Sequence, residues 1–132
     1  DLGVKRTKNS DELLYSRTKI INACKACKVD AIDTPFTDTN DYEGLMADTL
    51  KAKMLGFTGK LSINPRQIDT IHKGYAPSEA EITHAQRVMA AKEEAAKQGL
   101  GVFSLDGKMV DLPIINRAIH TLDMAKLMGL ID

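Results

Sequence analysis

The sequence predicts an α/β fold that continues into a mainly helical segment. Two short apolar runs, residues 31–36 and 60–63, are each closed by a proline, Pro35 or Pro65. Proline cannot donate to a sheet ladder and is typical of a strand end. A helical pattern with polar caps lies between the two runs. Because parallel strands need such a crossover, the sequence predicts a βαβ unit.

The first helix is expected from about Ser10 to Lys28. Ser10 would cap it, and the acidic Asp11 and Glu12 would suit the positive end of the helix dipole. Four residues recur at helical spacing and predict a buried stripe: Leu13, Ile20, Cys24 and Cys27. The two cysteines lack the further ligands of a zinc site and the preceding strand of a redox motif. Packing as small hydrophobic residues is therefore the favoured interpretation.

The crossover helix is expected from about Tyr42 to Leu55. Asn40 or Asp41 would cap its start, and Gly56 would end it. A short helix, residues 67–73, is expected after the second strand. These elements form the first predicted domain, which ends at residue 76.

Residues 77–132 are predicted to form a helical domain with one hairpin. Ser78 and Glu81 have the spacing of a capping box, which predicts a long helix ending near Gly99. Within the hairpin, residues 102–110, two apolar runs flank the pair Asp106-Gly107. Such a pair suits the positive φ angles of a two-residue turn.

Asp111 stands between this hairpin and a last helix, expected from about Leu112 to Met128. Leu112 and Pro113 follow it directly, and proline is tolerated in the first turn of a helix. From its position alone, Asp111 is predicted to be an N-cap whose carboxylate accepts the free amides of that turn. A functional carboxylate is the alternative.

Charge and composition exclude several classes of function. Eighteen basic residues balance eighteen acidic ones, so no net field attracts nucleic acid or an anionic membrane. With 43% hydrophobic residues, the chain is not disordered by composition. No apolar run is long enough to span a bilayer, and no signal-peptide core is present. A cytoplasmic location is expected.

Three ordered blocks carry a resemblance to a known family: residues 1–36, residues 56–77 (GFTGKLSINPRQIDTIHKGYAP) and the segment GLGVFSLDGKMVDLPIINRA. They resemble the citrate lyase β-subunit family of CoA-ester lyases and aldolases. The resemblance implies the C-terminal portion of a TIM-type (β/α)8 barrel, with its last two strands and their helices, plus a hairpin and helix extension. Two parallel strands leave backbone groups unpaired at both edges, which indicates a truncated chain.

The resemblance also implies a reaction. Members cleave a citryl thioester, carried on CoA or on the phosphopantetheine of a carrier protein, to oxaloacetate and an acetyl thioester. The Mg²⁺ ligands of the family lie upstream of this chain, so no metal ligand is assigned here and the chain alone is expected to be inactive. A malyl-CoA or citramalyl-CoA lyase and a non-catalytic helical assembly module are the alternatives.

Site residues follow from the same resemblance. Asp111 is implied to be catalytic, exchanging a proton with the acetyl methyl carbon in the active site of a neighbouring subunit. The carboxyl ends of barrel strands carry the chemistry of this fold, which implies a set of substrate-binding residues. These are Asp33, Thr34, Pro35, Asn64 and Pro65. For each of them, a role as strand terminator or turn residue is the alternative.

The implied partners include phosphate groups and other subunits. The basic cluster Lys5, Arg6 and Lys8 would contact the phosphates of a pantetheine arm, or would simply form a solvated loop. Copies of the chain would assemble as a trimer or hexamer in which the C-terminal extension reaches a neighbour. Acyl-carrier and transferase subunits of citrate lyase are further implied partners, whereas neither nucleic acid nor a membrane is expected.

Overall fold

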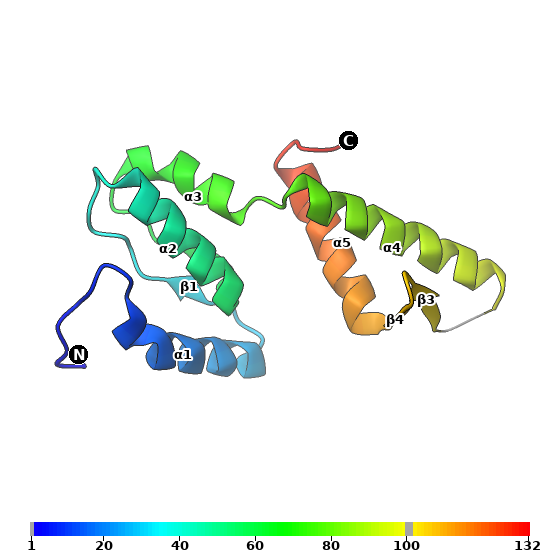
Figure 1. The fold of residues 1–132 in the computed structure, drawn as a ribbon, viewed down its shortest axis with the longest axis horizontal. Helices are drawn as coiled ribbons and strands as arrows, with labels where there is room; N and C mark the ends of the chain where they lie inside the picture. Colours follow the sequence, from blue (N-terminus) through cyan, green and yellow to red (C-terminus); the bar gives the residue numbers. More distant parts are fainter. Residues whose placement is uncertain (1, 100–101) are drawn as a thin grey trace. The chain divides into compact units, whose positions relative to one another are not determined.

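The computed structural model describes residues 2–99 and 102–132 and contains two compact units (Figure 1). Unit 1 is Asp1–Tyr75 and unit 2 is Ala76–Asp132. Asp1, Leu100 and Gly101 lie outside the described residues. None of the described helices is long and apolar enough to cross a membrane.

Unit 1 contains a βαβ arrangement, as the sequence predicts. In chain order its elements are η1 (Asp11–Leu13), α1 (Leu14–Cys27), β1 (Ile32–Asp33), α2 (Tyr42–Leu55), β2 (Gly59–Lys60), η2 (Pro65–Gln67) and α3 (Ile68–Tyr75). β1 and β2 are parallel, with Ile32 opposite Gly59 and Asp33 opposite Lys60. Both strands are shorter than predicted, because among the described residues neither has a partner along its second edge.

The start of α1 corrects two sequence predictions. Ser10 has a left-handed backbone, with φ of 53°, and its side chain makes no capping hydrogen bond. The predicted Ser10 cap is therefore wrong. The predicted buried stripe is wrong at Ile20 and Cys27, which are exposed, while Arg17 and Ile21 are buried. Cys24 packs against the core of unit 1, as predicted. Arg17 pairs with the carboxylates of Asp33 and Asp48, so the buried face of α1 is shifted by one residue from the predicted apolar face.

The crossover helix α2 confirms the prediction at both ends. The Gly44 N–H donates to Asp41 Oδ1 at 2.9 Å, so Asp41 is the cap. The helix ends at Gly56, whose φ of 107° is disfavoured for residues with a side chain. The aromatic ring of Phe57 then enters a small core with Ile21, Ala31 and Ala52.

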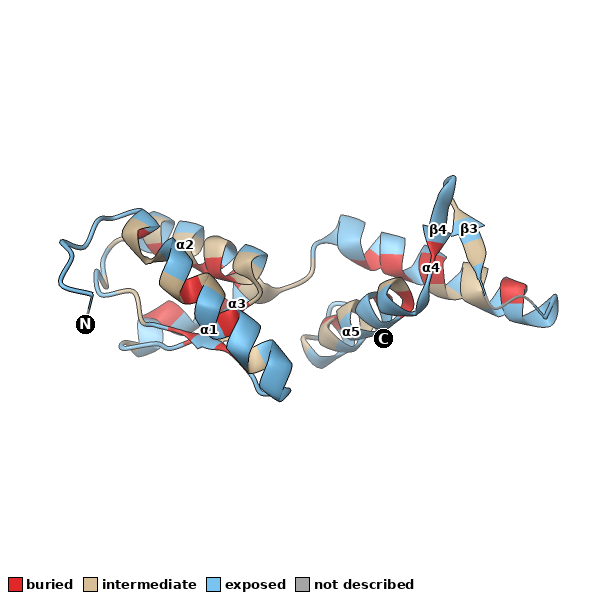
Figure 2. Ribbon diagram, turned by 90° about the horizontal axis from the view of Figure 1, so that it is seen from below, coloured by how far each residue is buried: buried red, intermediate tan, exposed pale blue. Residues whose placement is uncertain are grey.

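Unit 2 is a helix, a hairpin and a second helix, which confirms the predicted elements. α4 (Glu79–Lys97) begins with the complete Ser78–Glu81 capping box. β3 (Phe103–Leu105) and β4 (Lys108–Val110) are antiparallel, and positive φ angles at Asp106 and Gly107 form the turn. α5 (Leu112–Leu127) packs on α4. Figure 2 shows the buried residues of this unit, whose core cluster is Ala85, Val88, Val110, Ile115 and Ala118.

Candidate functional site

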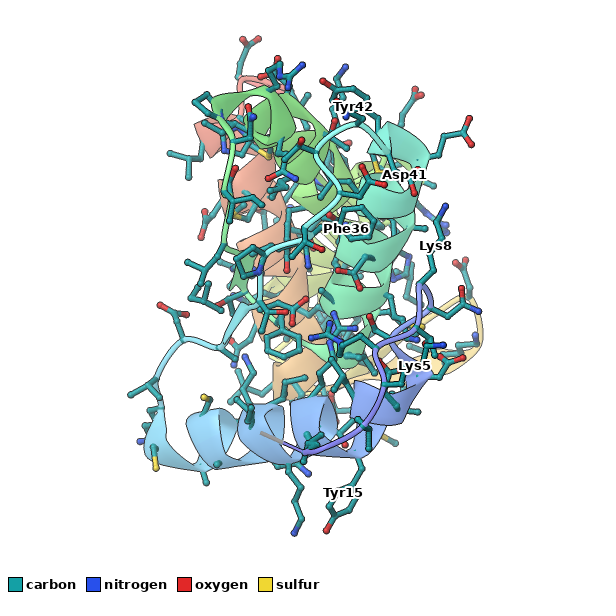
Figure 3. The ribbon with its side chains drawn as sticks, turned by 90° about the vertical axis from the view of Figure 1, so that its left-hand side faces the viewer. Lys5, Lys8, Tyr15, Phe36, Asp41 and Tyr42 are labelled. Carbon is teal, nitrogen blue, oxygen red and sulfur yellow. The ribbon has the colours of Figure 1, made fainter. Side chains whose placement is uncertain are left out.

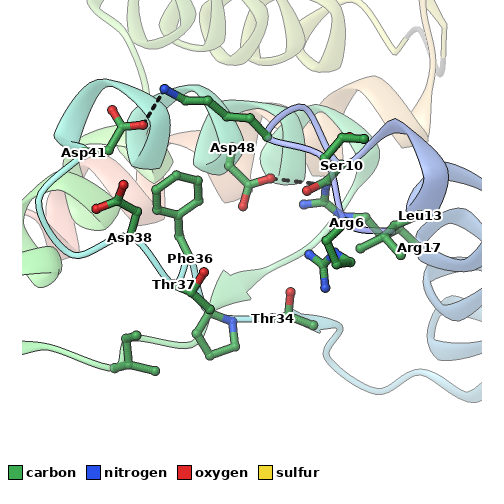
Figure 4. A pocket seen from close by; sticks show the side chains of 14 residues that line it. Arg6, Ser10, Leu13, Arg17, Thr34, Phe36, Thr37, Asp38, Asp41 and Asp48 are labelled. Carbon is green, nitrogen blue, oxygen red and sulfur yellow. Dashed lines mark hydrogen bonds and ion pairs between the residues drawn. The ribbon is translucent and has the colours of Figure 1, made fainter. Parts of the chain in front are cut away.

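A cavity of about 590 Å³ lies in unit 1, beside the carboxyl end of β1 (Figure 4). One wall is the loop after β1, residues 34–38. Another is the segment that leads into α1, and α2 contributes Asp48 together with its cap Asp41. Because the ends of parallel strands meet at one edge of a sheet, this is where the sequence placed a binding site.

The structure brings part of the predicted set to this cavity. Thr34 and Pro35 line it, as do the Phe36 and Thr37 side chains that follow. Asn64 and Pro65 are not in its lining, although the neighbouring Ile63 is. Asn64 instead caps η2, where its Oδ1 accepts the Arg66 N–H at 3.0 Å.

Two members of the predicted basic cluster also reach the cavity. Arg6 and Lys8 line it, whereas Lys5 does not. Thr7 lies between them and donates to Glu12 through its N–H, at 3.1 Å, and its hydroxyl, at 2.6 Å. These bonds stabilise the carboxylate and lower the pKa of Glu12 to about 2. Glu12 therefore anchors the cationic segment to the start of α1.

Lys8 pairs with the cap of α2. Its Nζ lies 2.6 Å from Asp41 Oδ2. This hydrogen bond and ion pair raise the pKa of Lys8 and lower the pKa of Asp41. The N-terminal segment and α2 are thereby joined across one side of the cavity.

A buried network of four charges forms the floor beneath the cavity. Arg17 pairs with Asp33, and it also lies 3.3 Å from Asp48. The Lys60 ammonium lies 3.0 Å from Asp33 and 2.5 Å from Asp48, and it donates to the Thr34 carbonyl at 2.8 Å. The Lys60 side chain is completely enclosed. Two cations balance two carboxylates, as buried charges require.

This network changes the interpretation of Asp33. The sequence predicts Asp33 as a substrate-binding residue, but its carboxylate is 2% exposed and is occupied by Arg17 and Lys60. Arg17 does line the cavity, and its Nε has no hydrogen-bond partner among the described residues. Its guanidinium also lies 5.6 Å from the centre of the Phe57 ring. Asp33 thus orients Arg17 from below.

Gln67 connects the two loops at the strand ends, and the sequence did not indicate this. Its Nε2 donates to the Phe36 carbonyl at 2.9 Å, and its Oε1 accepts the Ile63 N–H at 3.2 Å. The side chain is buried. A glutamine in the first turn after an Asn-Pro pair is the signal that could have suggested such a clamp.

Arg17, Asp48 and Lys60 were also missed. Each is a single charged residue without a motif around it, and such charges are usually solvated. The only signal in the sequence was that residues of opposite charge would lie side by side in a βαβ unit. This signal can be used only when the strand register is known.

Asp111 lies in unit 2 and is exposed. Its Oδ1 accepts the Ile114 N–H at 3.3 Å, so the predicted cap of α5 is confirmed. Its apolar neighbours Met109 and Leu112 are 69% and 66% exposed. One oxygen of the carboxylate thus accepts the capping hydrogen bond, and exposed apolar residues stand close to Asp111 in the sequence.

The cavity lining combines charged, polar and apolar groups. Arg6, Lys8 and Arg17 supply positive charge, and Asp38, Asp41 and Asp48 supply negative charge. The hydroxyl of Thr34 and the ring of Phe36 supply polar and apolar contacts. Within the part of the chain that the structure describes, no three His, Cys, Asp or Glu side chains are grouped as metal ligands.

Comparisons with known proteins find similar sequences. The family model described as HpcH/HpaI aldolase/citrate lyase matches residues 1–65, which lie in unit 1. Citrate lyase subunit beta of Escherichia coli K12 is 45% identical over 130 residues, covering 98% of this chain and 43% of the relative. Human mitochondrial citramalyl-CoA lyase is 34% identical, covering 94% of this chain and 36% of the relative.

A solved structure is also similar. CitE from Mycobacterium tuberculosis, in complex with magnesium, acetoacetate and coenzyme A, is 31% identical with a TM-score of 0.78. The match covers 94% of this chain and 46% of that protein. The chain thus spans less than half the length of the relatives it matches.

Proposed function

Since the chain is a homologue of the citrate lyase β subunits, we propose that it is part of a carbon–carbon lyase that cleaves a citryl thioester to oxaloacetate and an acetyl thioester. The observation that carries this proposal is the extent of the similarity. It covers 98% of the chain, so it includes both the cavity of unit 1 and the hairpin that presents Asp111 in unit 2.

The two strands are proposed to be the last two of a (β/α)8 barrel. Asp33 and Lys60 point to the side covered by α1 and α2, where they meet Arg17 and Asp48. Apolar neighbours along the strands and the loop after β2 are about half exposed: Ile32, Leu61 and Ile63. Side chains alternate across a strand, so these residues define a second, uncovered face. Further strands of a longer protein would cover that face and both open edges.

The cavity is proposed to hold the carrier arm of the substrate. CoA and phosphopantetheine both bear phosphates, for which Arg6 and Lys8 supply charge. Thr34 and Pro35, with Asn64 and Pro65 across the strand ends, would contact the thioester and its acyl group. Asp33 would act indirectly, by holding Arg17 in the cavity wall.

Asp111 is proposed as the acid of the reaction. A base of the longer protein would take the hydroxyl proton of the citryl group, the carbon–carbon bond would break, and oxaloacetate and an acetyl thioester enolate would form. The Asp111 carboxylic acid would give its proton to the methylene carbon of that enolate, which forms the methyl group. The exposed apolar side chains of Met109 and Leu112 support docking of this segment against a neighbouring copy.

Magnesium is proposed for the complete enzyme only. The CitE structure holds magnesium with acetoacetate and coenzyme A. The described residues of this chain do not offer a ligand set for the ion. Its ligands would therefore lie elsewhere in the longer protein, and no step is assigned to it here. The citrate lyase complex, a trimer or hexamer of this subunit and a cytoplasmic location stay predictions.

The test is Asp111→Asn in the longer protein, assayed for acetyl thioester release from the citryl thioester. Asparagine keeps the capping oxygen but cannot donate the proton, so a loss of at least about 100-fold in kcat is expected with unchanged assembly. Asp123→Asn, an exposed carboxylate of α5, is the matched control. Turnover within a factor of two of the parent would contradict the role of Asp111, whereas absence of turnover by the parent protein would favour a non-catalytic module.

A second candidate function is supported by the human relative, whose name is citramalyl-CoA lyase. The same assay with citryl, malyl and citramalyl thioesters separates these substrates. A higher kcat/KM for citryl thioesters supports the proposal. A higher kcat/KM for malyl or citramalyl thioesters would change the proposed substrate but not the proposed type of reaction.

A further inference from the structure

Residues 6–9, called the strap, are held by four separate contacts, and Arg6, Thr7 and Lys8 line one side of the cavity. Arg6 Nε lies 3.4 Å from Glu12 Oε1. Thr7 is bound to Glu12 at the start of α1. Lys8 is paired with Asp41 at the start of α2. The Asn9 carbonyl accepts the Lys51 ammonium at 2.7 Å.

The contact of Lys8 with Asp41 differs from the others in its exposure and its position. Lys8 is 70% exposed, and both residues line the cavity. Figure 3 shows the two side chains meeting beside Phe36. Exposed ion pairs contribute little to stability and are screened by salt, so a competing anion can displace one of the partners.

Asp41 does not depend on Lys8 for its structural role. Its Oδ1 accepts the Gly44 N–H at 2.9 Å, and its Oδ2 takes the lysine. The cap of α2 would remain if Lys8 moved away. Lys8 is therefore free to exchange partners without loss of the helix start.

A second observation indicates a place for a hydrogen-bond acceptor beside this cavity. The Arg17 side chain is only 7% exposed, yet its Nε lacks a partner among the described residues and the side chain lines the same cavity (Figure 4). A buried N–H without a partner is rare and costly. An acceptor oxygen of a bound group would satisfy it, while Arg6 and Lys8 would supply further charge.

We propose that Lys8 is an exchangeable ligand for an anionic group such as phosphate, and that Asp41 holds Lys8 when no such group is bound. The Asp41 carboxylate thus competes with the ligand for one ammonium group. This proposal rests on the proposed function in one respect, because the phosphates of a CoA or phosphopantetheine thioester would be the natural occupants.

The test measures the affinity of the chain for inorganic phosphate at low ionic strength, by titration followed by NMR. Asp41→Asn keeps the capping oxygen but releases Lys8, and it is expected to tighten binding by about threefold to tenfold. Lys8→Met is expected to weaken binding by a similar factor. Lys5→Met removes the same charge from the same segment outside the cavity lining, and it is expected to change affinity by less than twofold.

Two further variants separate release of Lys8 from the simple loss of a negative charge. Asp38→Asn removes a carboxylate of the same cavity lining that carries no ion pair to Lys8, and its oxygen still accepts the Asn40 N–H. Asp38→Asn should increase the affinity for phosphate by less than Asp41→Asn does. In the double variant Lys8→Met/Asp41→Asn the gain from Asp41→Asn should disappear, because there is no lysine to release.

Three results would overturn the proposal. The first is that Asp41→Asn increases phosphate affinity as much in the Lys8→Met background as in the parent. The second is that Asp38→Asn increases this affinity as much as Asp41→Asn does, and the third is that no variant binds phosphate. None of them bears on Asp111, because the titration contains no thioester. Conversely, absence of turnover by the parent protein would contradict the proposed function, and full turnover by Asp111→Asn would contradict the role of Asp111; both would leave the exchange of Lys8 intact.

Discussion

The two units of this chain bury different kinds of side chain. Among the described residues, every buried polar or charged side chain lies in unit 1: Ser10, Arg17, Asp33, Thr49, Lys60 and Gln67. The buried residues of unit 2 are all apolar, and its core cluster joins α4, the hairpin and α5. Unit 1 also contains the cavity, whereas unit 2 presents a single exposed carboxylate at a helix cap.

This difference shows two ways of positioning functional groups. Buried ion pairs contribute little net stability, because desolvation offsets their attraction, but they hold side chains in fixed orientations. In unit 1 the network orients Arg17 toward the cavity and ties Lys60 to the loop after β1. In unit 2 a tight turn and an apolar core place Asp111 at the start of α5.

The largest expected effect comes from breaking the charge balance of unit 1. Lys60→Met leaves Asp33 and Asp48 with Arg17 as their only partner in the network, and should lower the free energy of unfolding by about 3–5 kcal/mol. Urea unfolding measures this loss. Ile115→Val in the apolar core of unit 2 is the comparison, with an expected loss of about 0.5–1.5 kcal/mol. Equal losses for the two variants would show that the charges of the network do not depend strongly on one another for stability.

A smaller effect compares two serines that precede helices. Ser78 accepts the Glu81 N–H in the capping box of α4, so Ser78→Ala should cost about 1 kcal/mol. Ser10 makes no capping bond before α1, and Ser10→Ala should cost less than about 0.5 kcal/mol. Thermal unfolding of the two variants tests the difference. A larger loss at Ser10 than at Ser78 would contradict the assignment of the caps.

The smallest effect is the pH dependence of the strap. The pKa of Glu12 is lowered from 4.5 to about 2 by its hydrogen bonds with Thr7. Because the pKa is lower in the folded state, the Glu12 contribution to stability is complete above pH 4.5 and is lost as the pH falls toward about 2. An NMR titration of the Glu12 carboxyl should give a midpoint well below 4.5, and Thr7→Val should raise that midpoint. A midpoint of 4.5 in the parent would show that the anchor does not form in solution.

Local sequence signals predicted most elements, because each of those signals acts within a few residues. The Asp41 cap and Gly56 bracket α2, and the Ser78–Glu81 box starts α4 where expected. The Asp106-Gly107 turn and the Asp111 cap are equally local. Ser10 is the exception among the caps, because the residue is pulled into a left-handed conformation at a 3-10 turn.

The candidate site was predicted less completely. The loop after β1 and two cations of the basic cluster were anticipated, since both follow from strand order or composition. Arg17, Asp48, Lys60 and Gln67 were not, because their partners are 12 to 31 residues away in the sequence. The same long-range contacts occupy Asp33, which the sequence alone presents as an available carboxylate at a strand end.

By itself, the sequence determined the order and boundaries of helices, the hairpin turn and the family resemblance, since caps, turns and apolar periodicity are short-range properties. Only the tertiary structure decided which face of α1 is buried, which charges pair and which side chains meet at the cavity. Those outcomes depend on the register of β1 against β2, and hydrophobic patterning does not specify where a buried charge finds its counter-charge.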